Sequence, residues 1–329
     1  MDYVELGNSR LKVSRVGLGC MGMSEYYPGF NEKESVATLH RAVELGINFF
    51  DTADEYGMGK NEELLGKAFK GIRDQVIIAS KFGFVRDASG NTLGIDGSPR
   101  HVREACEASL KRLQTDYIDL YYLHRIDPRT PVEDTLNALL DLKDQGKIRA
   151  IGLSEASART IERASRVAKI SAVQSEYSLW TRDPEQNGVM ESCNRNGISF
   201  VPFSPLGRGF LTGRFRKPGE ITVDDYRSQF PRFSKENFDS NLKIVEELAV
   251  ISSEKGITNS QLALAWVLSR GKNLVPIPGT KKVRYLEENA RAVDVVLTQN
   301  DLSRIDEVFR KNPVRGERYS NDAMKYVDR

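Results

Sequence analysis

The stretch GINFFDTADEYG, residues 46–57, carries the pattern on which the fold assignment depends. A glycine that can end a helix is followed by a short apolar run, Asn48–Phe50, and then by the charged residue Asp51. Before the stretch, apolar residues recur at the spacing of one helix face: Val36, Leu39, Ala42 and Val43. The pattern therefore predicts a helix, a short turn and a buried strand with a polar end.

The same unit recurs along the chain. Seven further candidate strands, separated by helical patterns, are Val16–Leu18, Val76–Ala79, Tyr117–Leu123, Arg149–Leu153, Ala172–Ser175, Ser199–Phe203 and Leu274–Ile277. The eight units run from Ser14 to Ala292, about 35 residues each, which is the size of a β/α unit. We therefore predict an α/β fold, one (β/α)8 TIM barrel, with residues 1–329 as a single domain. A doubly wound open sheet is the alternative, but no linker or change in composition divides the chain.

Further segments lie before, within and after the eight units. Tyr3–Leu6 and Leu11–Val13 flank a Gly-Asn turn and predict an N-terminal β-hairpin. Leu206–Asn237 follows the seventh strand and is longer than a routine connection, which is typical of a functional or mobile loop. Thr298–Arg310 predicts one further C-terminal helix, and residues 311–329 a tail.

Charge and composition narrow the class of protein. Forty-eight basic and 46 acidic residues leave a net charge of +2, which argues against binding to nucleic acid or to an anionic membrane surface. No run approaches the roughly 18 apolar residues that span a bilayer, and the acidic N-terminus lacks the apolar core of a signal peptide. Cys20, Cys106 and Cys193 are too far apart in the sequence for a disulfide framework or a metal cluster. We expect a cytoplasmic protein without a metal; the pattern does not indicate an oligomeric state.

Ionisable side chains follow three successive predicted strands. Asp51, Lys81 and His124 end the second, third and fourth strands, and Tyr56 lies on the loop after Asp51. Active sites of such barrels lie at the carboxyl ends of the strands, so these four side chains should meet there. A purely structural salt bridge between Asp51 and Lys81 is the alternative interpretation.

This combination of side chains suits the protonation of a carbonyl oxygen. A free tyrosine has a pKa of about 10 and donates a proton poorly at neutral pH. A neighbouring cation lowers that pKa, so we expect Lys81 to activate Tyr56 while Asp51 holds Lys81 in place. His124 would position the carbonyl oxygen or help to relay the proton. The partner step is hydride delivery from a cofactor.

Two basic, glycine-rich segments predict a site for a phosphorylated cofactor. Pro278-Gly279-Thr280 leads into a helix predicted to begin near Lys281, with cations in its first turn: Lys281, Lys282 and Arg284. Cations oppose the dipole of a helix start, so their presence favours an anionic ligand there. A second loop supplies glycines with Arg208 and Arg214. Two anion sites on adjacent units favour NADP(H) over NAD(H).

A third glycine-rich segment, GLGCMG at residues 17–22, matches the dinucleotide fingerprint G-x-G-x-x-G in letters. That fingerprint requires a helix to begin at once, whereas the helical pattern begins only near Glu32. We therefore expect these glycines to let the backbone approach a ligand at the end of the first strand.

Several motifs together resemble the aldo-keto reductase family over about residues 1 to 295. They are GINFFDTA with Tyr56-Gly57, Ser80-Lys81, DYIDL (116–120) leading to His124, GKIR (146–149) before Gly152-Leu153-Ser154, Ser204-Pro205-Leu206-Gly207, and Pro278-Gly279-Thr280 with Glu288-Asn289. The resemblance implies a barrel that reduces carbonyl compounds with NADPH. In it, Tyr56 would be the proton donor, Lys81 and Asp51 would tune it, and His124 would position the substrate. The motif GERY, residues 316–319, is similar to the bacterial and plant branch.

The resemblance also implies which residues hold the cofactor. Ser154 and Gln174 match residues at the nicotinamide carboxamide, and Phe203 takes the place of a Tyr or Trp stacked on the nicotinamide. The adenosine end would be held by Gly279, Thr280, Lys281, Tyr285, Glu288 and Asn289. The other predicted cofactor contacts are Gly19, Met21, Asp51, Ser204, Pro205, Leu206, Gly207, Gly209 and Arg214. Glu155 departs from the family, in which many members have Asn at this position.

Two alternative functions stay open. The family includes potassium-channel β-subunits, so a non-catalytic NADPH-binding regulatory subunit is the first alternative. A barrel aldolase with Lys81 as a Schiff-base lysine is the second. For a reductase we expect a small carbonyl substrate, whose identity the sequence does not indicate. Candidate pocket walls are Tyr27, Phe82, His124, Trp180, Phe230 and the tail with Tyr319.

Overall fold

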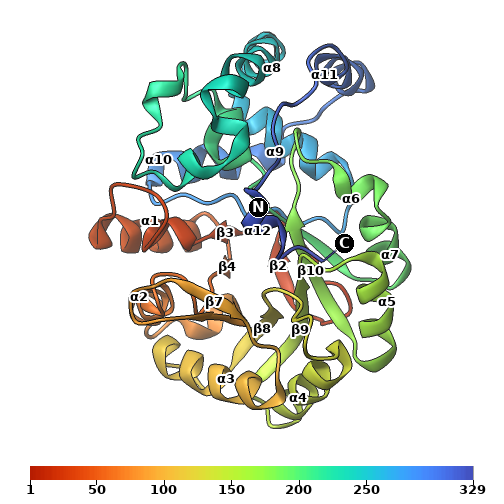
Figure 1. Ribbon diagram of the computed structural model, residues 1–329. Helices are drawn as coiled ribbons and strands as arrows, with labels where there is room; N and C mark the ends of the chain where they lie inside the picture. Colours follow the sequence, from red (N-terminus) through yellow and green to blue (C-terminus); the bar gives the residue numbers. More distant parts are fainter. Residues whose placement is uncertain (329) are drawn as a thin grey trace.

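Parallel strands form a barrel at the centre of the molecule. The computed structural model describes residues 1–328, and among them seven strands pair in the order β11-β10-β9-β8-β5-β4-β3. Every pair is parallel, and helices surround the strands in Figure 1. The strands are β3 (Leu18–Gly19), β4 (Phe49–Asp51), β5 (Ile77–Phe82), β8 (Ile118–Leu123), β9 (Ile148–Ser154), β10 (Ile170–Glu176) and β11 (Ser199–Phe203).

The eighth predicted strand closes the barrel but is irregular. The Val275 N–H donates to the Phe200 carbonyl at 3.0 Å, and the Gly17 N–H donates to the Pro276 carbonyl at 2.9 Å. The segment thus joins β11 to β3. A regular ladder cannot form because Pro276 has no N–H to donate, so Leu274–Ile277 is not the continuous strand that the pattern predicts. The (β/α)8 architecture itself is confirmed.

Helices alternate with the strands and cover their outer surface. The main ones are α1 (Glu32–Glu44), α2 (Lys60–Ala68), α3 (Pro99–Leu113), α4 (Val132–Asp144), α5 (Ala158–Val167), α7 (Val189–Arg195), α8 (Lys235–Glu254), α9 (Asn259–Ser269), α10 (Val283–Ala290) and α11 (Gln299–Lys311). The hairpin of β1 (Tyr3–Glu5) and β2 (Lys12–Ser14) confirms the predicted N-terminal hairpin. Leu6 and Val13 from this region are fully buried among the residues inside the barrel, so the hairpin closes the amino-terminal end.

Three additions surround the opposite end of the barrel. β6 (Phe84–Arg86) and β7 (Thr92–Ile95) form an antiparallel hairpin after β5. The long segment after β11 contains short 3-10 turns, from η3 (Gly207–Thr212) to η6 (Pro231–Phe233), before α8 begins. After α11, the tail carries the short helix α12 (Asn321–Met324) and crosses the centre of the helix ring in Figure 1.

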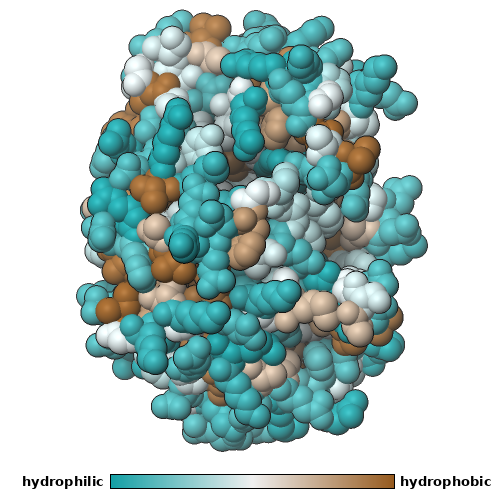
Figure 2. Space-filling model, turned by 90° about the vertical axis from the view of Figure 1, so that its left-hand side faces the viewer, coloured by the Kyte–Doolittle hydropathy of each residue, from teal (hydrophilic) through white to brown (hydrophobic). Residues whose placement is uncertain are grey.

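The face of the molecule that Figure 2 shows is mostly hydrophilic. Figure 2 shows hydrophobic side chains singly or in small groups among polar ones on one face of the molecule. Within residues 1–328, no helix combines the length and the apolar character needed to cross a membrane. In the same part of the chain, no cluster of three or more His, Cys, Asp or Glu side chains is arranged to hold a metal ion.

Candidate active site

A cavity of about 650 Å³ opens among the carboxyl ends of the strands. Asp51, Tyr56 and His124 line it, and Lys81 is fully buried behind its wall. Most of the residues predicted to hold the cofactor also line the cavity: Gly19, Met21, Ser154, Gln174, Phe203, Ser204, Pro205, Leu206, Gly209, Arg214, Gly279, Thr280, Lys281, Tyr285, Glu288 and Asn289. A concave site with polar groups at strand ends is the usual place for ligands in this fold.

Lys81 is the centre of a buried polar cluster. Its Nζ donates to Asp51 Oδ1 at 2.5 Å, to the Thr52 carbonyl at 2.7 Å and to the Tyr56 hydroxyl at 3.3 Å. The second carboxylate oxygen of Asp51 accepts from Gln174 Nε2 at 2.7 Å. All three ammonium donors are therefore engaged, and the buried charge is compensated. Lys81 therefore contacts the hydroxyl of Tyr56, the residue that the sequence predicts as the proton donor.

The hydroxyl of Tyr56 is held as a neutral phenol. Burial raises the pKa of Tyr56 well above its ordinary value, and the negative charge of Asp51 adds to the rise. The net direction is therefore opposite to the lowered pKa that the sequence analysis expects, because desolvation outweighs the effect of nearby positive charge. The physical reason is that the phenol is desolvated while the charge of Lys81 is balanced by Asp51. An acid must carry its proton before the reaction, so the neutral phenol is the state that proton donation requires.

His124 presents a neutral imidazole to the cavity. Burial lowers the pKa of His124 well below its ordinary value, and the charges of Arg125 and Lys81 lower it further. The Nδ1 atom is buried and has no hydrogen-bond partner within residues 1–328. The ring lies edge-on to Tyr56, with the two ring centroids 5.9 Å apart. The other ring nitrogen, Nε2, has no hydrogen-bond partner within residues 1–328 and lies 3.9 Å from Glu55 Oε1, so Nε2 is the ring atom left for a ligand that enters beside Tyr56.

Four residues that the sequence analysis predicts to contact a ligand do not line the cavity. Phe82 is fully buried and stacks on Tyr121, with ring centroids 4.9 Å apart. Trp180 stacks on Phe210 at 5.0 Å. Gly207 lies so close to Trp180 that an added Cβ would come within 2.6 Å of the indole ring. Phe230 is also buried and packs edge-on against Tyr226, with ring centroids 4.8 Å apart. In this structure Phe82, Trp180 and Phe230 thus pack in the interior and Gly207 against the indole ring, and none of the four lines the cavity.

Cations gather at one end of the cavity. Lys281, Lys282 and Arg214 line that end. Burial lowers the pKa of Lys281, and the neighbouring charge of Lys282 lowers it further. Lys281 Nζ donates to the carbonyls of Tyr27 and Pro28 at 3.1 and 2.7 Å, which ties the loop after β3 to this end. Positive groups that repel one another across a cavity favour an anionic ligand between them.

The helix at this end begins later than predicted. α10 starts at Val283, after the extended residue Lys282, rather than near Lys281. Arg284 does not line the cavity. Arg208 does line it, but its guanidinium pairs with Glu176 at 3.1 Å. Of the cations that the sequence predicts at this end, Arg284 and Arg208 are therefore not available to a ligand, and Lys281, Lys282 and Arg214 remain.

Residues 17–22 do not form a dinucleotide fingerprint. β3 ends at Gly19, the 3-10 turn Met21–Met23 follows, and α1 begins only at Glu32, as predicted. Gly19 and Met21 both line the cavity. A Cβ at Gly19 would come within 2.9 Å of the Ile277 carbonyl. Glycine is thus required here by the closure of the barrel as well as by the cavity.

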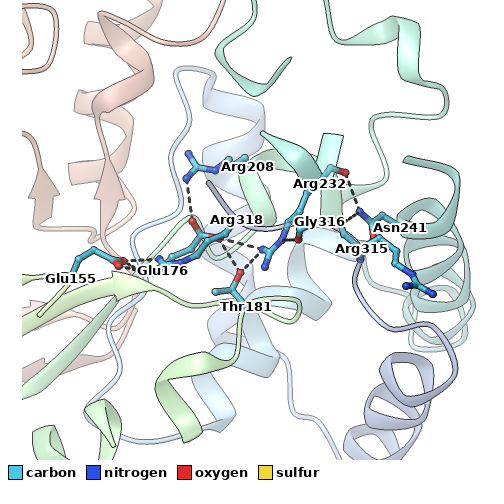
Figure 3. A network of polar contacts seen from close by, with 9 residues as sticks. All are labelled: Glu155, Glu176, Thr181, Arg208, Arg232, Asn241, Arg315, Gly316 and Arg318. Atoms are coloured by element: carbon cyan, nitrogen blue, oxygen red, sulfur yellow. Dashed lines mark hydrogen bonds and ion pairs between the residues drawn. The ribbon is translucent and has the colours of Figure 1, made fainter. Parts of the chain in front are cut away.

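A buried ion pair fastens the C-terminal tail across the rim (Figure 3). Arg318 donates two hydrogen bonds to Glu155, at 2.9 and 2.5 Å, and only 2% of the Glu155 side chain is exposed. Burial alone would raise the pKa of Glu155, but the charge and hydrogen bonds of Arg318 outweigh it and the pKa is lowered. Glu155, the departure from the family pattern, therefore anchors the tail.

A second cluster in Figure 3 joins the tail to the long segment after β11. Glu176 accepts hydrogen bonds from Arg208 and Arg232 at 3.1 and 3.5 Å, and Arg232 Nε donates to the Gly316 carbonyl at 3.3 Å. Gly316 has a φ of 86°, and a Cβ there would come within 2.7 Å of Pro231. The two clusters hold the tail so that three of its residues line the cavity: Tyr319, Ala323 and Tyr326.

Replacing Arg318 with Met should release the C-terminal tail from its contact with Glu155. The variant leaves Glu155 buried without its partner, and loss of one member of a buried pair costs about 3–5 kcal/mol. We expect a lower free energy of unfolding in urea and faster limited proteolysis of residues 316–328. The double variant Glu155→Gln/Arg318→Met should recover part of the loss, because no charge is then left unpaired. Equal stability of the wild type and Arg318→Met would contradict the role of this pair.

Several cavity residues were missed by sequence analysis. They include Glu55, Phe84, Tyr226 and Tyr326. Glu55 directly precedes Tyr56 in the sequence, and this position next to a predicted catalytic residue could have identified it as a cavity residue. Phe84 packs edge-on against His124 at 5.0 Å, from a hairpin whose short strands show little periodicity. The two tyrosines come from segments that only the folded chain brings to the cavity.

Comparison with known proteins shows the family to which the chain belongs. The model of the Aldo/keto reductase family matches residues 15–310. The chain is 43% identical over 319 residues to the NADP(+) aldo-keto reductase yakc of Schizosaccharomyces pombe, covering 96% of this chain and 93% of that protein. It is 44% identical over 320 residues to probable aldo-keto reductase 1 of Glycine max, with 97% and 92% covered.

Solved structures show the same likeness. A glycerol dehydrogenase from Gluconobacter oxydans superposes with a TM-score of 0.87 at 28% identity, covering 96% of this chain and 97% of that one. An aldo-keto reductase from Bacillus halodurans superposes with a TM-score of 0.78 at 31% identity, covering 94% and 96%. The family model, the curated relatives and the barrel with its strand-end cavity agree. The chain therefore belongs to the aldo/keto reductase family.

Proposed function

We propose that the protein uses NADP(H) to reduce an aldehyde or ketone to the alcohol, with Tyr56 as the proton donor. The observation that carries the proposal is the chain of hydrogen bonds from Asp51 through Lys81 to the Tyr56 hydroxyl, beside His124, whose Nε2 has no hydrogen-bond partner within residues 1–328. A regulatory subunit that only binds the cofactor has no need of this arrangement. The aldolase alternative is disfavoured because Lys81 is fully buried and its three donors are engaged.

The cavity fits the proposed cofactor. Lys281, Lys282 and Arg214 form a cationic end suited to phosphate groups, and their mutual repulsion would be relieved by an anion. Gln174 lines the other end, where it also bonds Asp51, and offers an amide close to the reacting site. Phe203 supplies an aromatic face on the same wall. A relative at 43% identity is named for NADP(+), which supports the same cofactor here.

The mechanism follows from the protonation states of the cavity residues. When bound, NADPH supplies a hydride for the carbonyl carbon. The neutral imidazole of His124 donates a hydrogen bond to the carbonyl oxygen and orients it. As negative charge develops on that oxygen, the Tyr56 hydroxyl gives its proton and completes the alcohol. The ammonium of Lys81, 3.3 Å away and held by Asp51, stabilises the phenolate that remains.

Turnover of NADPH with a panel of aldehydes and ketones tests the proposed function. We expect NADPH consumption matched by alcohol formation for at least one class of carbonyl compound. Tight NADPH binding without turnover of any carbonyl would favour the regulatory-subunit alternative. A covalent adduct trapped on Lys81 by borohydride would favour the aldolase.

The variant Lys281→Ala/Lys282→Ala should weaken NADPH binding much more than NADH binding. The 2′-phosphate distinguishes the two cofactors, and we propose that these lysines, at the cationic end of the cavity, contact it. We expect the wild type to prefer NADPH at least about tenfold, which corresponds to about 1.4 kcal/mol, and the variant to lose most of this preference. Fluorescence titration with both cofactors measures it. The control variant Lys33→Ala/Lys70→Ala removes two exposed lysines, and thus the same charge, and should keep the preference for NADPH. Equal affinities of the wild type for NADPH and NADH would contradict this assignment and make NAD(H) a candidate cofactor again.

A further inference from the structure

One carboxylate on the cavity wall has no partner in the protein. Glu55 precedes Tyr56, lines the cavity and has a side chain that is only 10% exposed. Its carboxylate accepts no hydrogen bond from any residue in the range 1–328, and Oε1 lies 3.9 Å from Nε2 of His124. A carboxylate this buried is normally hydrogen-bonded, because burial removes it from water. Its oxygens are not among the fully enclosed unpartnered atoms of residues 1–328, so they open to the cavity, where a ligand can replace water as the hydrogen-bond donor.

The cations around Glu55 are all engaged elsewhere. Arg86 donates to both oxygens of Glu25, at 3.0 and 2.7 Å, and reaches only the backbone carbonyl of Glu55. Arg125 donates to the His124 carbonyl at 2.6 Å and to the Ser154 hydroxyl at 3.2 Å. The positive charges of these guanidinium groups act on the Glu55 carboxylate, but neither group donates a hydrogen bond to it. The Glu55 oxygens remain directed to the cavity.

The other carboxylates that line the cavity have partners. Within residues 1–328 they are Asp51 and Glu288. Asp51 accepts from Lys81 and Gln174 through its two oxygens. Glu288 accepts from the Thr258 hydroxyl at 2.8 Å and belongs to the end proposed for the cofactor. Glu55 is thus the carboxylate placed to accept a hydrogen bond from a substrate.

We propose that Glu55 is a specificity-determining residue that accepts a hydrogen bond from a hydroxyl group on the carbon next to the reacting carbonyl. This inference rests on the proposed function, which places the carbonyl oxygen between Tyr56 and His124. A hydroxyl on the adjacent carbon lies about 3 Å from that oxygen, so Glu55 and His124 can bond the two groups together. The enzyme should therefore favour hydroxyaldehydes and hydroxyketones, and it should disfavour aldehydes that carry a carboxylate.

The surroundings of Glu55 make its charge depend on pH. Burial raises the pKa of Glu55 to about 7, although Arg125 and Arg86 favour the charged form. His124 stays neutral because its own pKa is lowered by burial. The charged and titratable groups that face Glu55 from the neighbouring elements are Glu25, Tyr26, Asp54, Tyr56, Lys81, Arg86, His124, Arg125 and Tyr226. A Glu55→Gln variant removes the charge of Glu55 alone.

Matched aldehydes test the hydroxyl contact. Glyceraldehyde and propanal have the same carbon chain and differ in hydroxyl groups. We expect the wild type to prefer glyceraldehyde in kcat/KM, and we expect Glu55→Leu to lower the ratio of the two kcat/KM values about tenfold or more. Hydration of the aldehydes is the same for every variant, so it cancels when these ratios are compared. Glu63→Gln removes an exposed carboxylate on α2 and should leave the ratio unchanged.

A charged aldehyde tests the carboxylate itself. Succinic semialdehyde carries a carboxylate that butanal lacks. In the wild type the ratio of kcat/KM for succinic semialdehyde to that for butanal should rise as the pH falls through about 7, because Glu55 takes up a proton. In Glu55→Gln the ratio should be higher and nearly independent of pH. A wild-type ratio that shows no such rise would overturn the charge effect.

The outcomes separate this inference from the function on which it rests. If the wild type reduces neither these four aldehydes nor any other aldehyde or ketone of the panel with NADPH, the proposed function fails; if it reduces other carbonyl compounds but none of the four, the role of Glu55 is overturned. If it reduces the four and the glyceraldehyde-to-propanal ratio is the same in Glu55→Leu and Glu55→Gln as in the wild type, the function stands and the role of Glu55 is overturned. Should Glu55→Leu not fold, the isosteric Glu55→Gln still decides the charge effect through its pH profile.

Discussion

Tyr56→Phe should reduce kcat for carbonyl reduction by about 100-fold or more and leave NADPH affinity nearly unchanged. The substitution removes only the hydroxyl that lies 3.3 Å from Lys81 Nζ. The phenyl ring keeps its packing against His124 and Tyr26. The groups proposed to hold the cofactor phosphates are separate from this hydroxyl, so binding should survive. Steady-state rates at saturating aldehyde, together with NADPH titration of the same preparation, measure both quantities.

A matched control for this variant is Tyr226→Phe. Tyr226 also lines the cavity, but its hydroxyl has no hydrogen bond to Lys81. We expect Tyr226→Phe to retain far more of the turnover than Tyr56→Phe. Near-normal kcat in Tyr56→Phe would show that another group supplies the proton.

Lys81→Met should abolish most turnover and also destabilise the protein. The phenolate formed at Tyr56 would lose the neighbouring charge that stabilises it. Asp51 would stay buried with Gln174 as its remaining side-chain donor, and breaking a buried pair in this way costs about 3–5 kcal/mol. Urea unfolding gives the stability, and single-turnover rates of the folded fraction give the chemical step.

The double variant Asp51→Asn/Lys81→Met separates the two effects. It removes both charges, so the stability should partly return. Turnover should not return, because the cation beside Tyr56 is still missing. Recovery of turnover in the double variant would mean that Lys81 only balances Asp51 and takes no part in proton donation.

The barrel and the meeting of the catalytic side chains were predictable because they follow from local patterns. Short apolar runs at regular spacing predict parallel strands, and strand topology then brings Asp51, Lys81 and His124 to one end. The irregularity of the eighth strand could also have been predicted from the sequence, because Pro276 has no N–H to donate a hydrogen bond to a neighbouring strand. These features need no knowledge of contacts between distant residues.

Other features depend on contacts that no local pattern carries. Glu155 and Arg318 are 163 positions apart, and their pairing places the tail over the cavity. The direction of the Tyr56 pKa depends on how completely the ring is buried, which residue types alone do not reveal. Phe82 lies at a strand end beside Lys81, yet its side chain points into the core. Whether a strand-end residue faces the cavity is set by packing of the whole barrel.

Transfer of deuterium from labelled NADPH to the product tests the central claim most directly. NADPH carrying deuterium at both hydrogen positions of the reactive nicotinamide carbon is incubated with the wild type and glyceraldehyde, and the alcohol is analysed by mass spectrometry. We predict deuterium at the former carbonyl carbon in an amount equal to the cofactor consumed, with this transfer nearly lost in Tyr56→Phe. Cofactor that stays unconsumed with every carbonyl tested, or an alcohol without the label, would contradict the assignment of this cavity as the active site of a carbonyl reductase.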